Sequence, residues 1–173
     1  MEASIRTHSG QTFYYDKPED FEYSLADIGY ALGNICRFVG QAGWWSVAQH
    51  SLLVSELVEP KDKLRGLLHD AAEAFVTDLP SALKHMPQMT FYRELDKRIT
   101  KAIYRQFGVP EDKEANKRVK QMDILAYEME SKLLGRGKVY EELAIDVPLW
   151  IRALNNGEAG REFERRAVWL MEQ

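Results

Sequence analysis

The stretch LRGLLHDAAEAF, residues 64–75, has the apolar pattern of a central core helix. Its apolar residues recur at steps of three and four, which is the spacing of one face of an α-helix. That face is wide enough for a helix at the centre of a core, and Pro60 is suited to the first position of such a helix. His69, Asp70 and Glu73 lie on the same segment. We therefore predict one central helix that carries titratable side chains and is ended by Asp78-Leu79-Pro80-Ser81.

Helical patterns continue on both sides of this segment. Ser24 with Asp27, and Ser46 with Gln49, have the spacing of capping boxes, in which two residues three apart bond each other's backbone. We predict helices over about 25–36, 47–58, 90–107 and 111–134, the last ended by Gly135-Arg136-Gly137, and two shorter helices that begin at Pro148 and Glu158.

The expected fold class is all-α. A short hairpin or irregular arm over Ile5–Tyr15 precedes the helices. No regular alternation of strands and helices supports a parallel sheet. The 173 residues fit a single domain, with a core over 24–134 and C-terminal helices over 148–173.

The composition argues against several classes of function. Lys and Arg number 23 and Asp and Glu number 27, so the formal net charge of −4 argues against a nucleic-acid polymer as partner. The first residues contain no apolar signal core, and no apolar stretch approaches the ~20 residues of a membrane span. The single cysteine, Cys36, suits a reducing compartment. We therefore expect a soluble cytoplasmic protein with no membrane partner.

Four residues of metal-ligand type fall on the predicted buried faces: His50, His69, Asp70 and Asp123. They belong to three separate helices whose apolar sides face a common core. A buried carboxylate is costly unless it is paired or bound to a cation. Two imidazoles and two carboxylates would form a mixed nitrogen and oxygen site, which suits Mn, Fe, Co, Ni, Zn or Mg better than calcium.

Each of these residues also has a structural interpretation. A lone histidine on an apolar face, such as His50, is more often a satisfied core residue than a ligand. His69-Asp70 is a common dipeptide, and Asp123 alone is compatible with a structural ion pair. The three positions together, in order on successive core helices, favour a metal site.

The order His50, His69-Asp70, Asp123 resembles the H…HD…D signature of the HD-domain metal-dependent phosphohydrolases. The words ICRF, SVAQHS and LHDAAEAF, which begin at residues 35, 46 and 68, resemble the branch with 5′-deoxynucleotidases and phage deoxynucleoside triphosphohydrolases. The resemblance covers about residues 7–134. It implies an HD-domain helical bundle in which these four residues bind one divalent ion: Co, Mn, Zn, Fe or Ni, or alternatively Mg.

The resemblance also assigns catalytic roles to two acids. Glu73, one turn after His69, corresponds to the acid that orients or activates the attacking water. Asp78 corresponds to a second acid near the leaving oxygen. Their structural alternatives are a solvated helix acid for Glu73 and, for Asp78, an N-cap of the turn at Ser81.

Three further residues are assigned to the substrate. Arg37 corresponds to a phosphate-binding arginine, and a planar guanidinium suits that role. Lys84 is expected as a second phosphate contact, and Phe38 corresponds to an aromatic that packs on the sugar and favours deoxyribose. The structural alternative for Arg37 is a surface arginine after a helix end, and Phe38 could equally be a core residue. For Trp44 and Trp45, stacking on a base, covering the site and ordinary packing all stay open.

Departures from the family pattern narrow the function. Hydrolases of the guanosine tetraphosphate alarmone carry an acidic pair at positions 73 and 74. Here Glu73 is followed by Ala74, so hydrolysis of that alarmone is disfavoured. The 18 residues between His50 and His69 are fewer than in the well-known bacterial deoxynucleotidases. The loop at 41–43 lacks a histidine found in some relatives, so a second metal ion is not expected.

The expected activity is metal-dependent hydrolysis of the 5′-phosphate ester of 2′-deoxynucleotides. The short chain favours the phage-like enzymes, so the best guess is a dATP triphosphohydrolase that releases deoxyadenosine and triphosphate and also accepts dADP and dAMP. The alternatives are a 5′-deoxynucleotidase acting broadly on dNMPs, another HD phosphodiesterase, and a non-catalytic nucleotide-binding module. Because members of this family commonly self-associate, we expect a homo-oligomer, in the host cytoplasm if the chain is phage-encoded.

Overall fold

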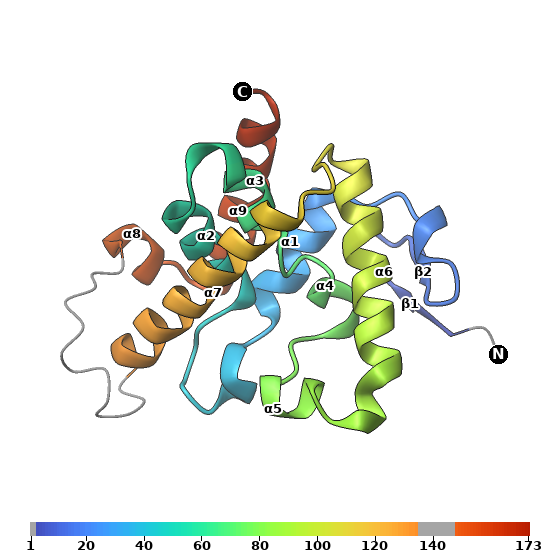
Figure 1. Cartoon of the computed structure of the whole chain (residues 1–173), viewed down its shortest axis with the longest axis horizontal. Coiled ribbons are helices and arrows are strands. Elements are labelled where there is room, and N and C mark those ends of the chain that lie inside the picture. Colours follow the sequence, from blue (N-terminus) through green and yellow to red (C-terminus); the bar gives the residue numbers. More distant parts are fainter. Residues whose placement is uncertain (1–2, 135–147) are drawn as a thin grey trace.

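The computed structural model describes residues 3–134 and 148–173, which are predominantly helical (Figure 1). This confirms the all-α class. The predicted helix end at Gly135-Arg136-Gly137 lies outside the described residues. Within the described ranges, no helix combines the length and apolar character needed to cross a membrane.

The helices follow the predicted order along the chain. The longer ones are α1 (Leu25–Asn34), α2 (Val47–Leu57), α6 (Thr90–Gln106), α7 (Lys113–Leu133) and α9 (Asn156–Met171). The shorter ones are α3 (Lys63–Leu68), α4 (Glu73–Val76), α5 (Ser81–Lys84) and α8 (Leu149–Arg152). Single 3-10 turns are η1 (Pro18–Asp20), η2 (Arg37–Gly40), η3 (Pro60–Asp62) and η4 (Pro87–Met89).

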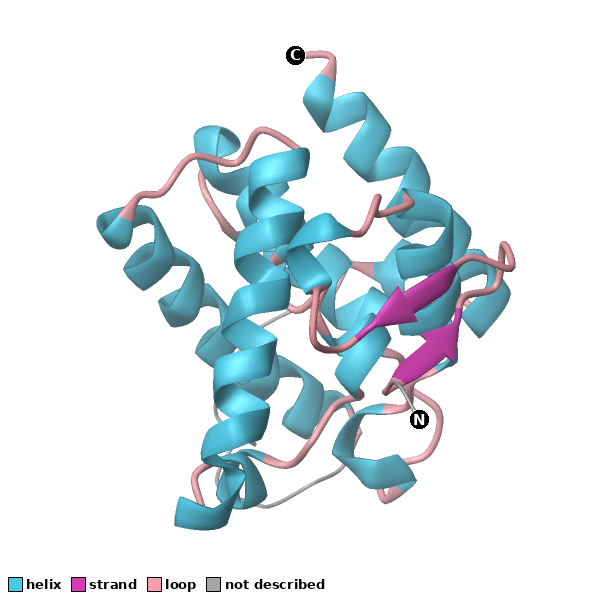
Figure 2. Cartoon of the chain, turned by 90° about the vertical axis from the view of Figure 1, so that its right-hand side faces the viewer, coloured by secondary structure: helices cyan, strands magenta, loops and turns pink. Residues whose placement is uncertain are grey.

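The predicted N-terminal hairpin is present. Strands β1 (Ser4–Arg6) and β2 (Thr12–Tyr14) pair antiparallel, with Ile5 opposite Phe13, and lie on one side of the helices (Figure 2). Phe13 is fully buried, and its ring centroid lies 4.5 Å from that of Phe75. The hairpin therefore contributes to the core instead of extending as a free arm.

The predicted capping residues begin their helices, with one difference. Ser46 and Gln49 form a complete capping box at α2. At α1 the Ser24 side chain accepts a bond from the backbone N–H of Asp27, as predicted. The Asp27 carboxylate, however, accepts bonds from the backbone N–H and the hydroxyl of Ser9 at 2.8 and 2.7 Å. Asp27 thus ties the hairpin to α1 and does not complete the box.

The prediction of one continuous central helix is wrong. α3 ends at Leu68 and α4 begins at Glu73. Between them the backbone N–H of Ala71 bonds the carbonyl of Leu68 at 3.1 Å, and that of Glu73 bonds Asp70 at 3.0 Å. These bonds span three residues and form a tighter turn than an α-helix. The regular α-helix is therefore interrupted at His69 and Asp70, two of the predicted ligand residues.

The C-terminal helix α9 packs closely on α1. A Cβ on Gly29 would lie 2.5 Å from the carbonyl oxygen of Gly160, and one on Gly33 would lie 2.5 Å from that of Asn156. The two backbones approach this closely because glycine stands at the crossing. α9 also contacts α2 and α3, and Phe163 on α9 is fully buried. The C-terminal segment is therefore part of the core that supports α2.

We predict that Gly160→Ala destabilises the fold. The added methyl would meet the Gly29 carbonyl and force α1 and α9 apart, and such overpacking costs about 1–3 kcal/mol. Urea unfolding followed by circular dichroism measures the change. Gly157→Ala is the matched control on the same helix, because its Cβ would meet only side-chain atoms, the nearer being the end of Arg161 at 3.3 Å. Equal losses of stability in both variants would contradict a close contact at Gly160.

Candidate metal centre

The structure brings the four predicted ligand residues together. His50 comes from α2, Asp123 from α7, and His69 and Asp70 from the turn between α3 and α4. His50 Nε2 lies 3.0 Å from Asp123 Oδ1 and 3.6 Å from Asp70 Oδ2. His69 Nε2 lies 3.1 Å from Asp70 Oδ2 and 3.9 Å from Asp123 Oδ1. The ligand atoms of His50, His69 and Asp123 all lie within 4.8 Å of one another, so one ion could contact them together.

The ring nitrogens of the two histidines fit a metal ion. His69 Nδ1 bonds the carbonyl of Gly66 at 2.8 Å, and His50 Nδ1 bonds Glu130 Oε1 at 2.7 Å. Because both partners only accept, Nδ1 carries the proton and the Nε2 of a neutral ring is free to bind a cation. His69 Nε2 is buried and makes no hydrogen bond among the described residues. A cation between the rings and the carboxylates would satisfy this atom.

The field at this centre favours positive charge. Burial opposes a charge on His69, but Asp70 and Asp123 outweigh it and hold the pKa of His69 well above its ordinary value. Burial also opposes a charge on His50, whose pKa is nevertheless raised by the carboxylates bonded to it. Burial alone would raise the pKa of the two aspartates, but the neighbouring histidines hold the pKa of each well below its usual range. The centre is therefore suited to a cation.

Glu130 is a site residue that the sequence reasoning missed. Its side chain is fully buried, and Oε1 accepts hydrogen bonds from His50 Nδ1 at 2.7 Å and Trp45 Nε1 at 2.9 Å. Its Oε2 accepts a bond from Arg37 Nε at 3.0 Å. Glu130 thus fixes the orientation of the His50 ring, as the outer partners of metal-ligating histidines do. A signal was available, since Glu130 follows Asp123 by two helical turns on the same face.

Glu73, Asp78 and Lys84 form a second polar group beside the ligands. Glu73 is buried, with Oε1 2.5 Å from Lys84 Nζ, and its Oε2 has no hydrogen-bond partner within residues 3–134 and 148–173. Asp78 Oδ1 lies 3.7 Å from the same Nζ. Burial and the nearby Asp70 raise the pKa of Glu73 well above its ordinary value, although Lys84 opposes this. Lys84, predicted as a phosphate contact, is therefore also the partner of the predicted catalytic acid.

A cavity of about 560 Å³ opens beside these groups, a size that holds small ligands. Seven of the predicted residues line it: Arg37, Phe38, Asp70, Glu73, Asp78, Lys84 and Asp123. It is also lined by side chains that the sequence reasoning did not select, among them His85, Lys120, Ile124 and Tyr127. His50 and His69 lie deeper and do not line it.

Strained backbone borders this cavity on two sides. Phe38 and Val39 have φ of 57° and 55°, and Thr77, which precedes Asp78, has φ of 65°. Among the described residues these are the non-glycine residues with positive φ. Such conformations are costly and cluster at functional sites. Their position supports a functional role for the cavity.

The basic and aromatic side chains in η2 and in the loop after it differ in how deeply they are buried. Arg37 is buried, held by Glu130, and its guanidinium carbon lies 5.3 Å from the centroid of the Phe38 ring. Trp45 is buried and packs in the core, whereas Trp44 is 54% exposed and does not line the cavity. Trp45 therefore packs in the core and donates a hydrogen bond to Glu130.

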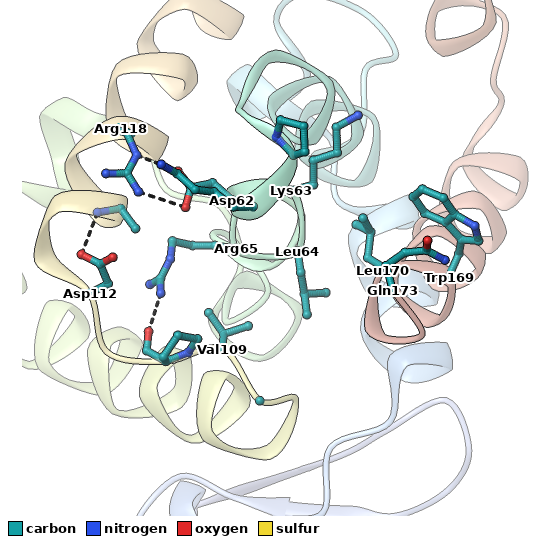
Figure 3. Close-up of a pocket in the computed structure, with 15 residues that line it drawn as sticks. Asp62, Lys63, Leu64, Arg65, Val109, Asp112, Arg118, Trp169, Leu170 and Gln173 are labelled. Atoms are coloured by element: carbon teal, nitrogen blue, oxygen red, sulfur yellow. Dashed lines mark hydrogen bonds and ion pairs between the residues drawn. The ribbon is translucent and has the colours of Figure 1, made fainter.

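A larger cavity, of about 930 Å³, lies between the start of α3, the connection from α6 to α7 and the end of α9 (Figure 3). Its charged groups are already paired. Arg118 bonds both oxygens of Asp62 at 2.7 and 3.2 Å, and buried Arg65 bonds Asn116 Oδ1 at 2.6 Å and the carbonyl of Pro110. The smaller cavity, beside the unbonded atoms of His69 and Glu73, is therefore the better candidate site.

Comparison with known proteins shows relatives but no activity. No family model matches the chain. The uncharacterized protein YfdR of Escherichia coli (strain K12) is 39% identical over 107 residues, which cover 61% of this chain and 59% of that protein. An uncharacterized protein of Rhodobacter capsulatus is 34% identical over 115 residues, which cover 61% of this chain and 58% of that protein. The chain thus matches less than two thirds of the length of either relative.

We predict that Glu130→Gln weakens both the fold and metal binding. Removing the charge leaves buried Arg37 uncompensated, which costs about 3–5 kcal/mol of unfolding free energy. Loss of the carboxylate behind His50 should lower metal affinity by about 10- to 100-fold. Urea unfolding and calorimetric titration with Mn²⁺ measure the two effects. Glu128→Gln, on the same helix, is the control and should change stability by less than about 0.5 kcal/mol. Unchanged Mn²⁺ affinity in Glu130→Gln would contradict the orienting role.

Proposed function

We propose that this chain is an HD-domain phosphohydrolase that hydrolyses the 5′-phosphate ester of 2′-deoxynucleotides. The proposal rests on one observation: in the part of the chain that the structure describes, the buried His69 Nε2 has no hydrogen bond, and it faces carboxylates beside a cavity lined by Glu73, an acid of raised pKa. The best substrate is dATP, cleaved to deoxyadenosine and triphosphate, with dADP and dAMP as further substrates. We further propose that the protein acts in the cytoplasm as a homo-oligomer, as the family resemblance implies.

His50, His69, Asp70 and Asp123 would hold one divalent ion. The mixed nitrogen and oxygen ligands suit Mn, Co, Fe, Ni or Zn, and also Mg. Such an ion would supply Lewis acidity towards a phosphate oxygen. The protein contributes by orienting the rings in advance, through Glu130 behind His50 and the Gly66 carbonyl behind His69.

Glu73 is assigned to the attacking water. Lys84 holds its Oε1, so the unbonded Oε2 is the atom able to accept a hydrogen bond and then a proton from water. As the new bond from the water oxygen to phosphorus forms, the bond from phosphorus to the 5′ oxygen breaks. Asp78 lines the same cavity and is assigned to the side of the leaving oxygen. There its carboxyl can relay a proton from solvent to the 5′ oxygen, while Glu73 gives the proton of the attacking water back to solvent.

Arg37 and Lys84 are assigned to phosphate charge. Both line the cavity, and preorganised cations lower the energy of a phosphoryl-transfer transition state. Arg37 is already held by Glu130, so its guanidinium needs little reorganisation to meet a phosphate oxygen. Phe38 is assigned to the sugar, where an apolar ring gives a 2′-hydroxyl no partner and so favours deoxyribose.

A substrate panel tests the function. Protein loaded with Mn²⁺, Co²⁺ or Mg²⁺ is incubated with each dNMP, dNTP and NTP, and the products are separated by chromatography. We expect deoxyadenosine and inorganic triphosphate from dATP, and loss of turnover in His69→Ala. Phosphate released from all dNMPs would instead establish the broad deoxynucleotidase. No turnover with any of these ions, or full activity of His69→Ala, would contradict the assignment as an enzyme.

We predict that Lys84→Met shifts the acidic limb of the pH–rate profile to higher pH. Lys84 lowers the pKa of Glu73, so its removal raises that pKa further and leaves Glu73 protonated at pH values where it should accept a proton. The measurement is kcat/KM against pH at saturating metal. Lys84→Arg retains the charge and should keep the limb near its original position. An unshifted limb in Lys84→Met would show that Glu73 is not the group that titrates.

A further inference from the structure

One face of α7 forms a wall of the 560 Å³ cavity. Lys120, Asp123, Ile124 and Tyr127 all line it, and their spacing of three and four places them on one side of the helix. Lys120 and Tyr127 are separated by roughly 10 Å along the helix axis, with the metal-ligand residue between them. The wall therefore has two ends of different chemistry on either side of Asp123.

The C-terminal end of this wall is apolar and aromatic. Tyr127 is 46% exposed and Ile124 is 50% exposed, so both present surface to the cavity and not only to the core. The ring centroid of Tyr127 lies 5.7 Å from that of Phe38 at an interplanar angle of 47°. Rings this close leave no slot between them. A planar ligand would lie against their exposed faces.

The N-terminal end of the wall is cationic. Lys120 Nζ lies 2.6 Å from Asp123 Oδ2, the oxygen that does not face His50. The Lys120 side chain is 70% exposed, so its ammonium group can also reach an anion in the cavity. Lys84, from α5, lines the same cavity. An anionic group would therefore meet the exposed ammonium of Lys120 at this end. The Tyr127 end is apolar and aromatic, and the nearby guanidinium of Arg37 is largely buried and already paired.

We propose that α7 sets the direction in which a nucleotide lies in the cavity. The nucleobase stacks on Tyr127 and Ile124, and the outer phosphates extend past Asp123 to Lys120. This inference rests on the proposed function, because it takes a deoxynucleotide as the ligand. In the reverse direction the outer phosphates would lie against aromatic and aliphatic surface and lose the exposed ammonium of Lys120 as a partner, which is costly.

The test compares the whole nucleotide with two ligands that lack the base, so that contacts to the base and contacts to the phosphates are measured separately. Binding of dATP, of 2′-deoxyribose 5-phosphate and of inorganic tripolyphosphate is measured by calorimetry on the Mn²⁺-loaded protein. The protein carries Glu73→Gln so that dATP is not consumed, and bound Mn²⁺ is verified in every variant. All ligands are titrated at saturating Mn²⁺, so a change in the metal site is not mistaken for a change in ligand contact.

Tyr127→Ala should weaken dATP binding roughly tenfold or more, because stacking on an aromatic ring contributes strongly to base binding. It should leave deoxyribose 5-phosphate and tripolyphosphate within about twofold, and Tyr127→Phe should bind dATP like the parent. Lys120→Met should weaken tripolyphosphate and dATP roughly tenfold, since bonds between charged groups are the strong ones. Phe91→Ala and Lys117→Met are matched controls, because both side chains are exposed and neither lines the cavity.

The outcomes distinguish this inference from the proposed function. Unchanged dATP binding in Tyr127→Ala, or an equal loss for tripolyphosphate, would overturn the stacking role. Unchanged tripolyphosphate binding in Lys120→Met would overturn the phosphate role. If the predicted pattern of binding appears but the parent protein hydrolyses no nucleotide, the orientation stands and the proposed hydrolysis fails. If dATP does not bind at all, both fail.

Discussion

The buried carboxylate of Glu130 ties together the segments that surround the candidate metal centre. From α7 it accepts hydrogen bonds from His50 on α2, from Trp45 just before α2, and from Arg37 in η2. Removing one member would leave a charge or a polar group unpaired in the core, at a cost of several kcal/mol. Because Asp123 Oδ1 lies 3.0 Å from the other ring nitrogen of His50, α7 places a carboxylate on each side of that ring. The position of α2 relative to α7 and the geometry of the centre are therefore set together.

Near the candidate metal centre, Asp70 differs from the neighbouring carboxylates in its ion-pair partners. Most carboxylates there have a basic partner: Glu130 with Arg37, Glu73 with Lys84, and Asp123 with Lys120. Among the described residues, the ion-pair partners of Asp70 are the two histidines, which are neutral in their ligand form. A cation between Asp70 and the rings would complete the balance. The same cation would offset the carboxylates that line the cavity before an anionic substrate enters.

Part of the fold could be predicted because its causes are local. The Ser46 and Gln49 box starts α2, and apolar periodicity marks the long helices, since both depend on residues a few positions apart. The interruption at residues 69–72 could not be predicted, because an apolar repeat suits a tight turn and a helix equally well over so few residues. Asp27 completed no box because its partner, Ser9, lies 18 residues away in another element.

The all-α class, the starts of the long helices and the four polar residues on apolar faces follow from patterns within short stretches of sequence. Which polar groups meet follows only from the packing of the whole chain. Glu130 lies on the same face of α7 as Asp123, so the sequence pattern marks both residues alike. Its role is visible only in its contacts with His50 and Arg37, which lie 80 and 93 residues earlier in the chain. The close contact of α1 and α9 at Gly29 and Gly160 likewise joins residues that are far apart in the chain, so the sequence pattern does not show it. Periodicity shows which face of a helix is buried, but the direction and distance between two buried faces depend on how the whole chain packs.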